Sequence, residues 1–148
     1  MIQKTCILIK PDGYEKKLVG KVISQLEQAG FQLQALRLLP PVKERLESFY
    51  AEHVGKHFFN SFLEFMLSGP VVATVWEGEN IIERSRKLIG ATDSPKAEPG
   101  TLRNLYGTDS RKNLVHGSDS VDSARREIRL LFQESDIYTT GSPSPIAH

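Results

Sequence analysis

The spacing of apolar residues along the chain separates strand-like segments from helix-like ones. Short runs of apolar, partly β-branched residues predict strands, at 5–10, 31–39 and 71–76, with a short last one at 113–116. Apolar residues that recur every three or four positions predict helices, at 18–26, twice within 43–67, at 80–89 and at 120–132. Strands and helices therefore alternate with short links. This predicts an α/β sandwich of sheet and helices but leaves the strand order open.

Residues that favour turns and caps mark the ends of these elements. The run Pro11-Asp12-Gly13 predicts a tight loop directly after the first strand. Gly30 stands where a helix would need a left-handed C-terminal cap, and Gly90 would close the helix that ends at Ile89. Asn80 and Ser120 are suited to cap the N-termini of the helices that follow them.

Two segments lack apolar periodicity. Residues 91–115 are rich in proline, glycine and polar side chains, and a loop of that length inside a compact domain is usually functional. The tail at 134–148 is rich in serine, proline and glycine and is expected on the surface. Because we find no internal repeat and no domain boundary, we expect residues 1–148 to form one domain.

The overall charge gives no reason to expect a polyanionic partner. The 148 residues include 19 lysines and arginines against 18 aspartates and glutamates, with 39% hydrophobic and 25% charged residues. These values are those of an ordinary globular protein, so any basic site must be built locally and no nucleic-acid partner is expected.

The chain also carries signals about its compartment. Its single cysteine, Cys6, lies in an apolar stretch, cannot form an internal disulfide and suits a reducing environment. The N-terminus lacks the length and cleavage site of a signal peptide. No stretch approaches the roughly 20 apolar residues that span a bilayer. We therefore expect a cytoplasmic protein without a membrane partner.

His116 and Glu127 form the most suggestive pair of reactive side chains. His116 lies between a predicted strand and a helix, next to Gly117, so one ring nitrogen could face a cleft. Glu127 precedes the core position Ile128, and its carboxylate could fold back and orient the imidazole, which would leave the other nitrogen as a nucleophile. The alternatives are a structural histidine and a surface glutamate paired with a neighbouring arginine.

Four polar residues far apart in the sequence could converge on phosphate. They are Lys10, Arg86, Thr92 and Arg103. Each of them alone is also compatible with a solvated surface position. Phosphoryl transfer mainly requires positioning and cations around the phosphate oxygens. Since the chain has neither G-x-x-x-x-G-K-[ST] nor G-x-G-x-x-G, side chains and a metal would have to hold the phosphate.

Two other readings of the reactive residues are weaker. His53 and His57 have helical i,i+4 spacing, but no cysteine or carboxylate framework accompanies them, so a structural zinc site is not favoured. Ser118 stands near His116, which could suggest a hydrolase. However, the chain has no G-x-S-x-G element, and residues so close in sequence rarely supply both nucleophile and base.

Several ordered motifs give the chain a specific resemblance. The run NLVHGSDS at 113–120 resembles the signature N-x-x-H-G-S-D of nucleoside diphosphate kinases. Further matches follow in family order, at Ile9–Gly13, Phe58-Phe59, Ser68–Val72, Trp76–Gly78, Gly90–Thr92 and Pro99–Arg103. The resemblance covers residues 2 to about 133. It implies an α+β fold, a ferredoxin-like α/β sandwich in which helices cover a four-stranded antiparallel sheet.

The resemblance also implies a mechanism. His116 would be the nucleophile that is phosphorylated in a ping-pong transfer between nucleoside triphosphates and diphosphates. Glu127 would orient it through a hydrogen bond, with Ser118 in the same network. Tyr50 would stand near the histidine and its phosphate.

Nucleotide contacts are implied in the same way. The phosphates would be held by Lys10, Arg86, Thr92 and Arg103. Asn113 with Lys10 would hydrogen-bond the sugar hydroxyl, and Phe58 would stack on the base. Magnesium would bridge the phosphates of the nucleotide. The partners implied are ATP, other nucleoside tri- and diphosphates, and further copies of the chain in a dimer, tetramer or hexamer.

The sequence departs from the family pattern in three places. The usual Gly-Asp pair after Arg103 is replaced by Asn104-Leu105, and the usual Gly-Arg before Asn113 is replaced by Arg111-Lys112. The ending at 138–148 also differs. A catalytically silent relative would lack the nucleophile, which this chain retains, and an RNA-binding sheet would need aromatic strands where this chain has aliphatic ones.

Overall fold

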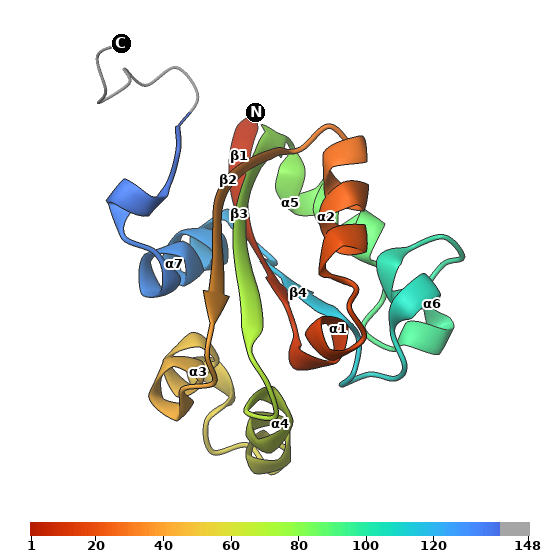
Figure 1. Cartoon of the computed structure of the whole chain (residues 1–148), viewed down its shortest axis with the longest axis vertical. Helices are drawn as coiled ribbons and strands as arrows, with labels where there is room; N and C mark the ends of the chain where they lie inside the picture. The colour runs from red at the N-terminus through yellow and green to blue at the C-terminus, as the bar shows by residue number, and fades with distance from the viewer. Residues whose placement is uncertain (140–148) are drawn as a thin grey trace.

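A computed structural model describes residues 1–139 of the chain. Four antiparallel strands form one sheet in the order β2-β3-β1-β4, and helices cover both of its faces (Figure 1). The strands are β1 (Ile2–Ile9), β2 (Gln32–Leu39), β3 (Val71–Glu79) and β4 (Val115–Gly117). The predicted layering of sheet and helices is therefore confirmed, and the strand order is now known.

Seven α-helices and three short 3₁₀-helices connect the strands within the described residues. The α-helices are α1 (Pro11–Glu15), α2 (Val19–Gln28), α3 (Lys43–Phe49), α4 (Phe59–Met66), α5 (Ile81–Ile89), α6 (Leu102–Tyr106) and α7 (Val121–Leu131). The 3₁₀-helices are η1 (Ala51–His53), η2 (Ser94–Lys96) and η3 (Glu134–Asp136). None of the helices in this part of the chain is long and apolar enough to cross a membrane.

The sheet separates two apolar cores because its strands alternate their side chains between the two faces. In β1, Cys6 and Leu8 pack against α3, α4 and α7, whereas Ile7 and Ile9 pack against α2, α5 and α6. Figure 1 shows α3 and α7 on one side of the sheet and α2, α5 and α6 on the other. All four of these β1 side chains are buried, as is expected for a central strand covered on both faces.

Most predicted caps are observed. Gly30 and Gly90 have φ angles of +89° and +95°, which glycine adopts without the steric cost of a Cβ. Ser120 begins α7, and its Oγ accepts a hydrogen bond from the Ser123 amide at 3.0 Å. Asn80 precedes α5 as predicted, but its side chain donates to Glu83 instead of capping a backbone amide.

Two short helices were not predicted. The residues expected only to form a tight loop begin α1, since Pro11 at the first helical position has a suitable fixed φ. Within the expected loop at 91–115, Thr101 caps α6 by accepting from the Asn104 amide at 3.3 Å. Helices of five residues are too short to give a recognisable apolar period, which explains both omissions.

The C-terminal tail is only partly described. Residues 134–139, which include η3, are exposed or half-buried, in keeping with the predicted surface position. The remaining residues of the predicted tail, 140–148, lie outside the described part of the chain.

Candidate active site

A cavity of about 520 Å³ opens between the two helical layers, beside β4. Nine of the ten residues singled out from the sequence line it: Lys10, Tyr50, Phe58, Arg86, Thr92, Arg103, Asn113, His116 and Glu127. The tenth, Ser118, is fully buried and contacts the cavity only through Glu127. The fold thus brings together residues that are separated by up to 117 positions in the sequence, from Lys10 to Glu127.

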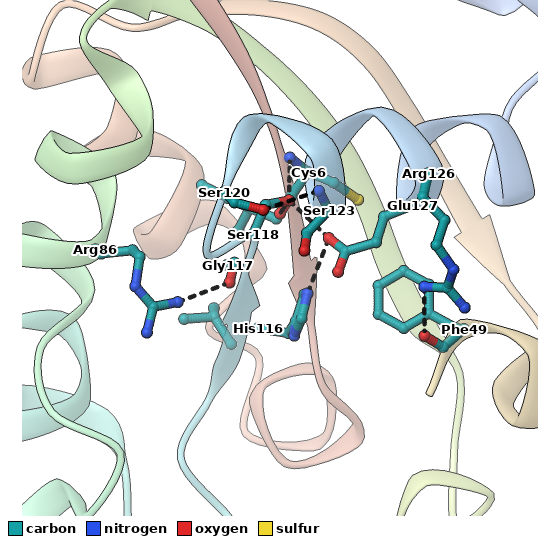
Figure 2. A network of polar contacts seen from close by, with 12 residues as sticks. Cys6, Phe49, Arg86, His116, Gly117, Ser118, Ser120, Ser123, Arg126 and Glu127 are labelled. Atoms are coloured by element: carbon teal, nitrogen blue, oxygen red, sulfur yellow. Dashed lines mark hydrogen bonds and ion pairs between the residues drawn. The ribbon is translucent and has the colours of Figure 1, made fainter. Parts of the chain in front are cut away.

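His116 lies in the middle of β4, where it pairs with Leu8 of β1. Its Nε2 is 3.1 Å from Glu127 Oε1 on α7 (Figure 2). A carboxylate accepts, so Nε2 carries the hydrogen, and in the neutral imidazole Nδ1 has the lone pair. Nδ1 has no hydrogen-bond partner among residues 1–139. The side chain is only 21% exposed, so this nitrogen is held in a fixed direction.

Ser118 fixes the other end of this contact. Its Oγ accepts from the Cys6 amide at 3.1 Å and lies 2.6 Å from Glu127 Oε1 and 3.2 Å from the Cys6 carbonyl oxygen. A hydroxyl has one proton, and the shorter distance indicates donation to Glu127. The buried Glu127 carboxylate oxygen therefore accepts from both Ser118 and His116, as Figure 2 shows.

Aromatic rings surround the imidazole on the side of α3. The ring of Phe49 meets His116 edge to face at 5.0 Å between centroids, and Tyr50 does so at 5.8 Å. Arg126 of α7 donates to the Phe49 carbonyl at 3.1 Å and ties these rings to the helix that carries Glu127. Neither Phe49 nor Arg126 was predicted from the sequence to belong to the site.

Tyr50 has a buried hydroxyl with no hydrogen-bond partner in the described part of the chain. Burial raises the pKa of its phenol, and the nearby Glu127 carboxylate raises it further. The hydroxyl consequently stays protonated and can donate to a group that enters the cavity.

Lys10 contributes a buried cation at the end of β1. Its Nζ donates to Asn113 Oδ1 at 2.6 Å, and Asn113 in turn donates through Nδ2 to the Thr92 carbonyl at 2.9 Å. Burial lowers the pKa of Lys10 to about 8, and repulsion from Arg103 contributes in the same direction. Lys10 is thus a desolvated ammonium that an anion in the cavity would stabilise.

Arg103 lies on α6, and three backbone carbonyls hold its side chain in place. Its guanidinium donates to Gly90 at 3.1 Å, Asn113 at 3.2 Å and Val115 at 2.8 Å. Burial lowers its pKa to about 10, and repulsion from Arg86 contributes. Arg86 donates to the Gly117 carbonyl at 3.1 Å, beside His116. Two guanidinium groups therefore lie near one another at the His116 end of the cavity.

The mouth of the cavity is lined by aromatic and polar residues. Phe58 directly precedes α4 and is 37% exposed. Across the mouth lies the loop segment with Ser110 and Arg111, neither of which was predicted from the sequence to belong to the site. A flat ring that faces a half-open slot can stack on a planar ligand.

A structural zinc site at His53 and His57 was not favoured from the sequence. His53 Nδ1 lies 3.2 Å from Lys56 Nζ, which would repel a metal cation. No group of three or more His, Cys, Asp or Glu side chains within residues 1–139 is arranged to hold a metal ion.

The chain matches known proteins along most of its length. The model of the family described as nucleoside diphosphate kinase matches residues 3–137. A nucleoside diphosphate kinase of Carboxydothermus hydrogenoformans is 48% identical over 136 residues, covering 92% of this chain and 91% of that protein. One of Actinobacillus pleuropneumoniae is 50% identical over 137 residues, covering 93% and 99%.

Solved structures agree with this match. The nucleoside diphosphate kinase of Aquifex aeolicus has a TM-score of 0.90 at 42% identity, covering 93% of this chain and all of that one. The enzyme of Halobacterium salinarum, solved in complex with CDP, has a TM-score of 0.91 at 38% identity, covering 96% and 95%. On sequence and structure together, the chain belongs to the nucleoside diphosphate kinase family.

Proposed function

We propose that the protein transfers the terminal phosphate of a nucleoside triphosphate to a nucleoside diphosphate through a phosphohistidine at His116. The observation that carries the proposal is the orientation of the imidazole. Glu127 accepts from Nε2 at 3.1 Å, and Nδ1 is left without a partner in the described residues. The cations Lys10, Arg86 and Arg103 line the same cavity.

The reaction proceeds in two half-reactions that use the same atoms in opposite order. In the first, the Nδ1 lone pair of His116 attacks the terminal phosphorus. The bond from phosphorus to the bridging oxygen breaks, and the electron pair leaves with the nucleoside diphosphate. In the second, a phosphate oxygen of the acceptor diphosphate attacks the phosphohistidine, and the electron pair of the P–N bond returns to Nδ1. The Nε2 proton stays between His116 and Glu127 throughout.

The cations stabilise the charge that spreads over the transferred phosphoryl group. Arg86 and Arg103 present guanidinium N–H groups, and Lys10 presents an ammonium whose desolvation strengthens its attraction for phosphate. The Tyr50 hydroxyl adds a neutral donor near the histidine. Thr92 would contribute a further polar contact from the cavity wall.

Magnesium fits this site as an ion that arrives with the nucleotide. The cavity is rich in cations, and the described residues offer no cluster of three or more His, Cys, Asp or Glu side chains for a metal. The ligands of the ion would then be phosphate oxygens and water, which magnesium prefers. When bound, it would neutralise phosphate charge. The residues of the protein would hold the nucleotide around it.

The base and sugar would occupy the outer half of the cavity. Phe58 offers a ring for stacking, which every base accepts, so both purine and pyrimidine nucleotides are expected as substrates. Asn113 and Lys10, which contact each other at 2.6 Å, would hydrogen-bond a sugar hydroxyl. The Halobacterium salinarum relative was solved in complex with CDP, which supports nucleotide binding by this chain.

Labelling with γ-³²P-ATP and magnesium in the absence of acceptor tests the proposal. Label should appear on His116 and should leave when any nucleoside diphosphate is added. A phosphohistidine is acid-labile and alkali-stable, whereas phosphoserine at Ser118 or Ser120 would resist acid. His116→Ala should lose both labelling and exchange, while His57→Ala, at an exposed histidine that does not line the cavity, should retain them. Acid-stable label, or label that persists in His116→Ala, would contradict the mechanism.

We also propose that the protein forms a homo-oligomer through the outer edge of β2. This strand lies at one end of the sheet and pairs only with β3 among the described strands. The Gln34 carbonyl accepts from the Tyr138 amide, but beyond it Leu36 and Leu38 are 52% and 58% exposed, and an exposed apolar edge strand favours association. Sedimentation velocity should give an oligomer for the wild type and a smaller species for Leu38→Lys. A wild-type monomer at micromolar concentration would contradict the proposal.

A further inference from the structure

Arg111 occupies a position where the sequence resemblance leads one to expect glycine, and its side chain crosses the mouth of the nucleotide cavity. It begins in the loop between α6 and β4 and reaches α4, where its Nη2 donates to Ser61 Oγ at 2.9 Å. Ser61 Oγ donates in turn to the carbonyl of Phe58 at 3.1 Å. Arg111 is thereby linked through Ser61 to the backbone carbonyl of Phe58, the residue whose ring would stack on the base.

The backbone around Arg111 is held firmly enough to fix where the side chain starts. Asp109 Oδ1 accepts from the amides of Arg111 at 2.9 Å and Lys112 at 2.7 Å. These two hydrogen bonds lower the pKa of the Asp109 carboxyl, which stays ionised and keeps the turn closed. On the inner side, the Arg111 carbonyl lies 3.5 Å from Lys10 Nζ.

The side chain forms a wall of the cavity. Arg111 lines both the nucleotide cavity and a second hollow of about 840 Å³ on the outer side, which Ser61 and Lys112 also line. The bond from Arg111 to Ser61 therefore separates the two hollows. A glycine at position 111 would leave them joined, because it would provide neither the stem nor the guanidinium.

A guanidinium has five N–H donors and no acceptor. Within residues 1–139, the guanidinium of Arg111 makes one hydrogen bond, the one to Ser61. The remaining donors are available to a ligand beside Phe58. Stacking on Phe58 does not distinguish one base from another, since it uses the face of the ring. Donors at the edge of the slot do distinguish bases, because bases differ in the acceptors along their edges.

We propose that Arg111 reads the edge of the base and gives this enzyme a preference for 6-oxopurine nucleotides over adenine nucleotides. The proposal rests on the function proposed above and specifies the substrate of the same site. Guanine carries two adjacent acceptors, O6 and N7, which match the two parallel N–H groups of an arginine. Adenine presents N7 beside the N6 amino group, whose donor hydrogens oppose those of the guanidinium.

Binding of nucleoside diphosphates, measured by isothermal titration calorimetry, tests this without depending on phosphoryl transfer. The probes are GDP, IDP and ADP. IDP keeps O6 and N7 but lacks the 2-amino group, so it should behave as GDP does. In Arg111→Met, which keeps an apolar stem in the wall but removes the donors, the preference for GDP and IDP over ADP should fall about tenfold, as expected for one bidentate contact. Ser61→Ala, which frees the guanidinium, should reduce the preference less.

Lys112→Met is the matched control, because it removes the neighbouring cation, which is exposed and does not line the nucleotide cavity. It should leave the ratio of affinities unchanged. An equal loss for all three nucleotides in Arg111→Met would assign the residue to phosphate or sugar and overturn the proposal. An unchanged ratio would overturn it as well. If the calorimetry succeeds while ATP labels no histidine, the proposed mechanism fails and the assignment of Arg111 stands.

Discussion

The two ends of the cavity differ in how they are built. At the inner end, His116 lies on β4, Ser118 directly follows β4 and Glu127 lies on α7. Glu127 accepts from the other two, and Ser118 Oγ also accepts from the Cys6 amide of β1. At the mouth, Phe58 and Arg111 lie at a helix start and in a loop, and both are partly exposed. In the proposed reaction, the inner end positions the atoms that react, which requires regular elements and buried contacts. The mouth would position a base that does not react, which a loop can do.

Two of the three departures from the family pattern, Asn104-Leu105 and Arg111-Lys112, fall in the loop that leads to the mouth and at the mouth itself. Asn104 replaces the usual glycine and donates from Nδ2 to the Ala97 carbonyl at 3.1 Å, which closes the turn before α6. Leu105 replaces the usual aspartate and is 51% exposed, so no ion pair forms there. Arg103 nevertheless keeps its three carbonyl contacts, and the inner end is undisturbed.

The largest effect is expected from Glu127→Ala, which removes the partner of His116 Nε2 at the inner end. Loss of an orienting group should lower kcat by a factor of about ten to ten thousand while KM changes little. Glu127→Gln should lose less, because its amide oxygen can still accept from Nε2. Steady-state kinetics with a thermal melt would separate an orienting role from a structural one.

Arg125→Gln is the matched control on the same helix, since the Arg125 side chain is 60% exposed and does not line the cavity. It should retain wild-type turnover. A well-folded Glu127→Ala protein with unchanged kcat would show that the inner end does not depend on the hydrogen bond to the imidazole. That result would contradict the proposal that the inner end, unlike the mouth, is built to orient reacting atoms.

Much of this architecture is predictable from local sequence. Apolar spacing located the long elements, and Gly90 and Ser120 located helix ends, because these signals act within a few residues. The helix α6 escaped detection because five residues show no period. Arg103 was predicted as a phosphate-binding candidate, but its carbonyl contacts were not, and Arg111 was not predicted as a site residue at all. Their partners lie on other elements, and an arginine at a given position does not reveal whether it points to a carbonyl, a phosphate or Ser61.

The pairing of His116 with Glu127 is only partly predictable from local sequence. His116 and Glu127 could be paired from sequence as a hypothesis, since both fall near the ends of predicted elements. Their convergence depends on β4 pairing with β1, which sets α7 against the same face. No periodicity in the chain encodes that pairing, so the resemblance to the family carried the assignment until the fold was known.

A smaller effect, and one that depends on pH, is expected at Lys10, which connects the two ends. Its pKa of about 8 is lowered mainly by burial, so the side chain is charged below about pH 8 and neutral above it. Because the charged form binds phosphate, kcat/KM should fall as pH rises from 7 to 9, by at most about tenfold per pH unit. In Lys10→Met, kcat/KM at pH 7 should be about tenfold or more below wild type, as for loss of a hydrogen bond to a charged group. The decline through pH 8 should also be absent.

Lys112→Met provides the control here too, since this lysine is exposed and outside the cavity, and it should keep the wild-type pH profile. Arg103 does not confuse the result, because its pKa of about 10 lies above the range examined. Bound nucleotide should hold the proton on Lys10, so kcat at saturating nucleotide should decline at a higher pH than kcat/KM does. A wild-type kcat/KM that stays level to pH 9, or a decline that persists in Lys10→Met, would remove Lys10 as the phosphate-binding cation that joins the reactive end of the cavity to its mouth.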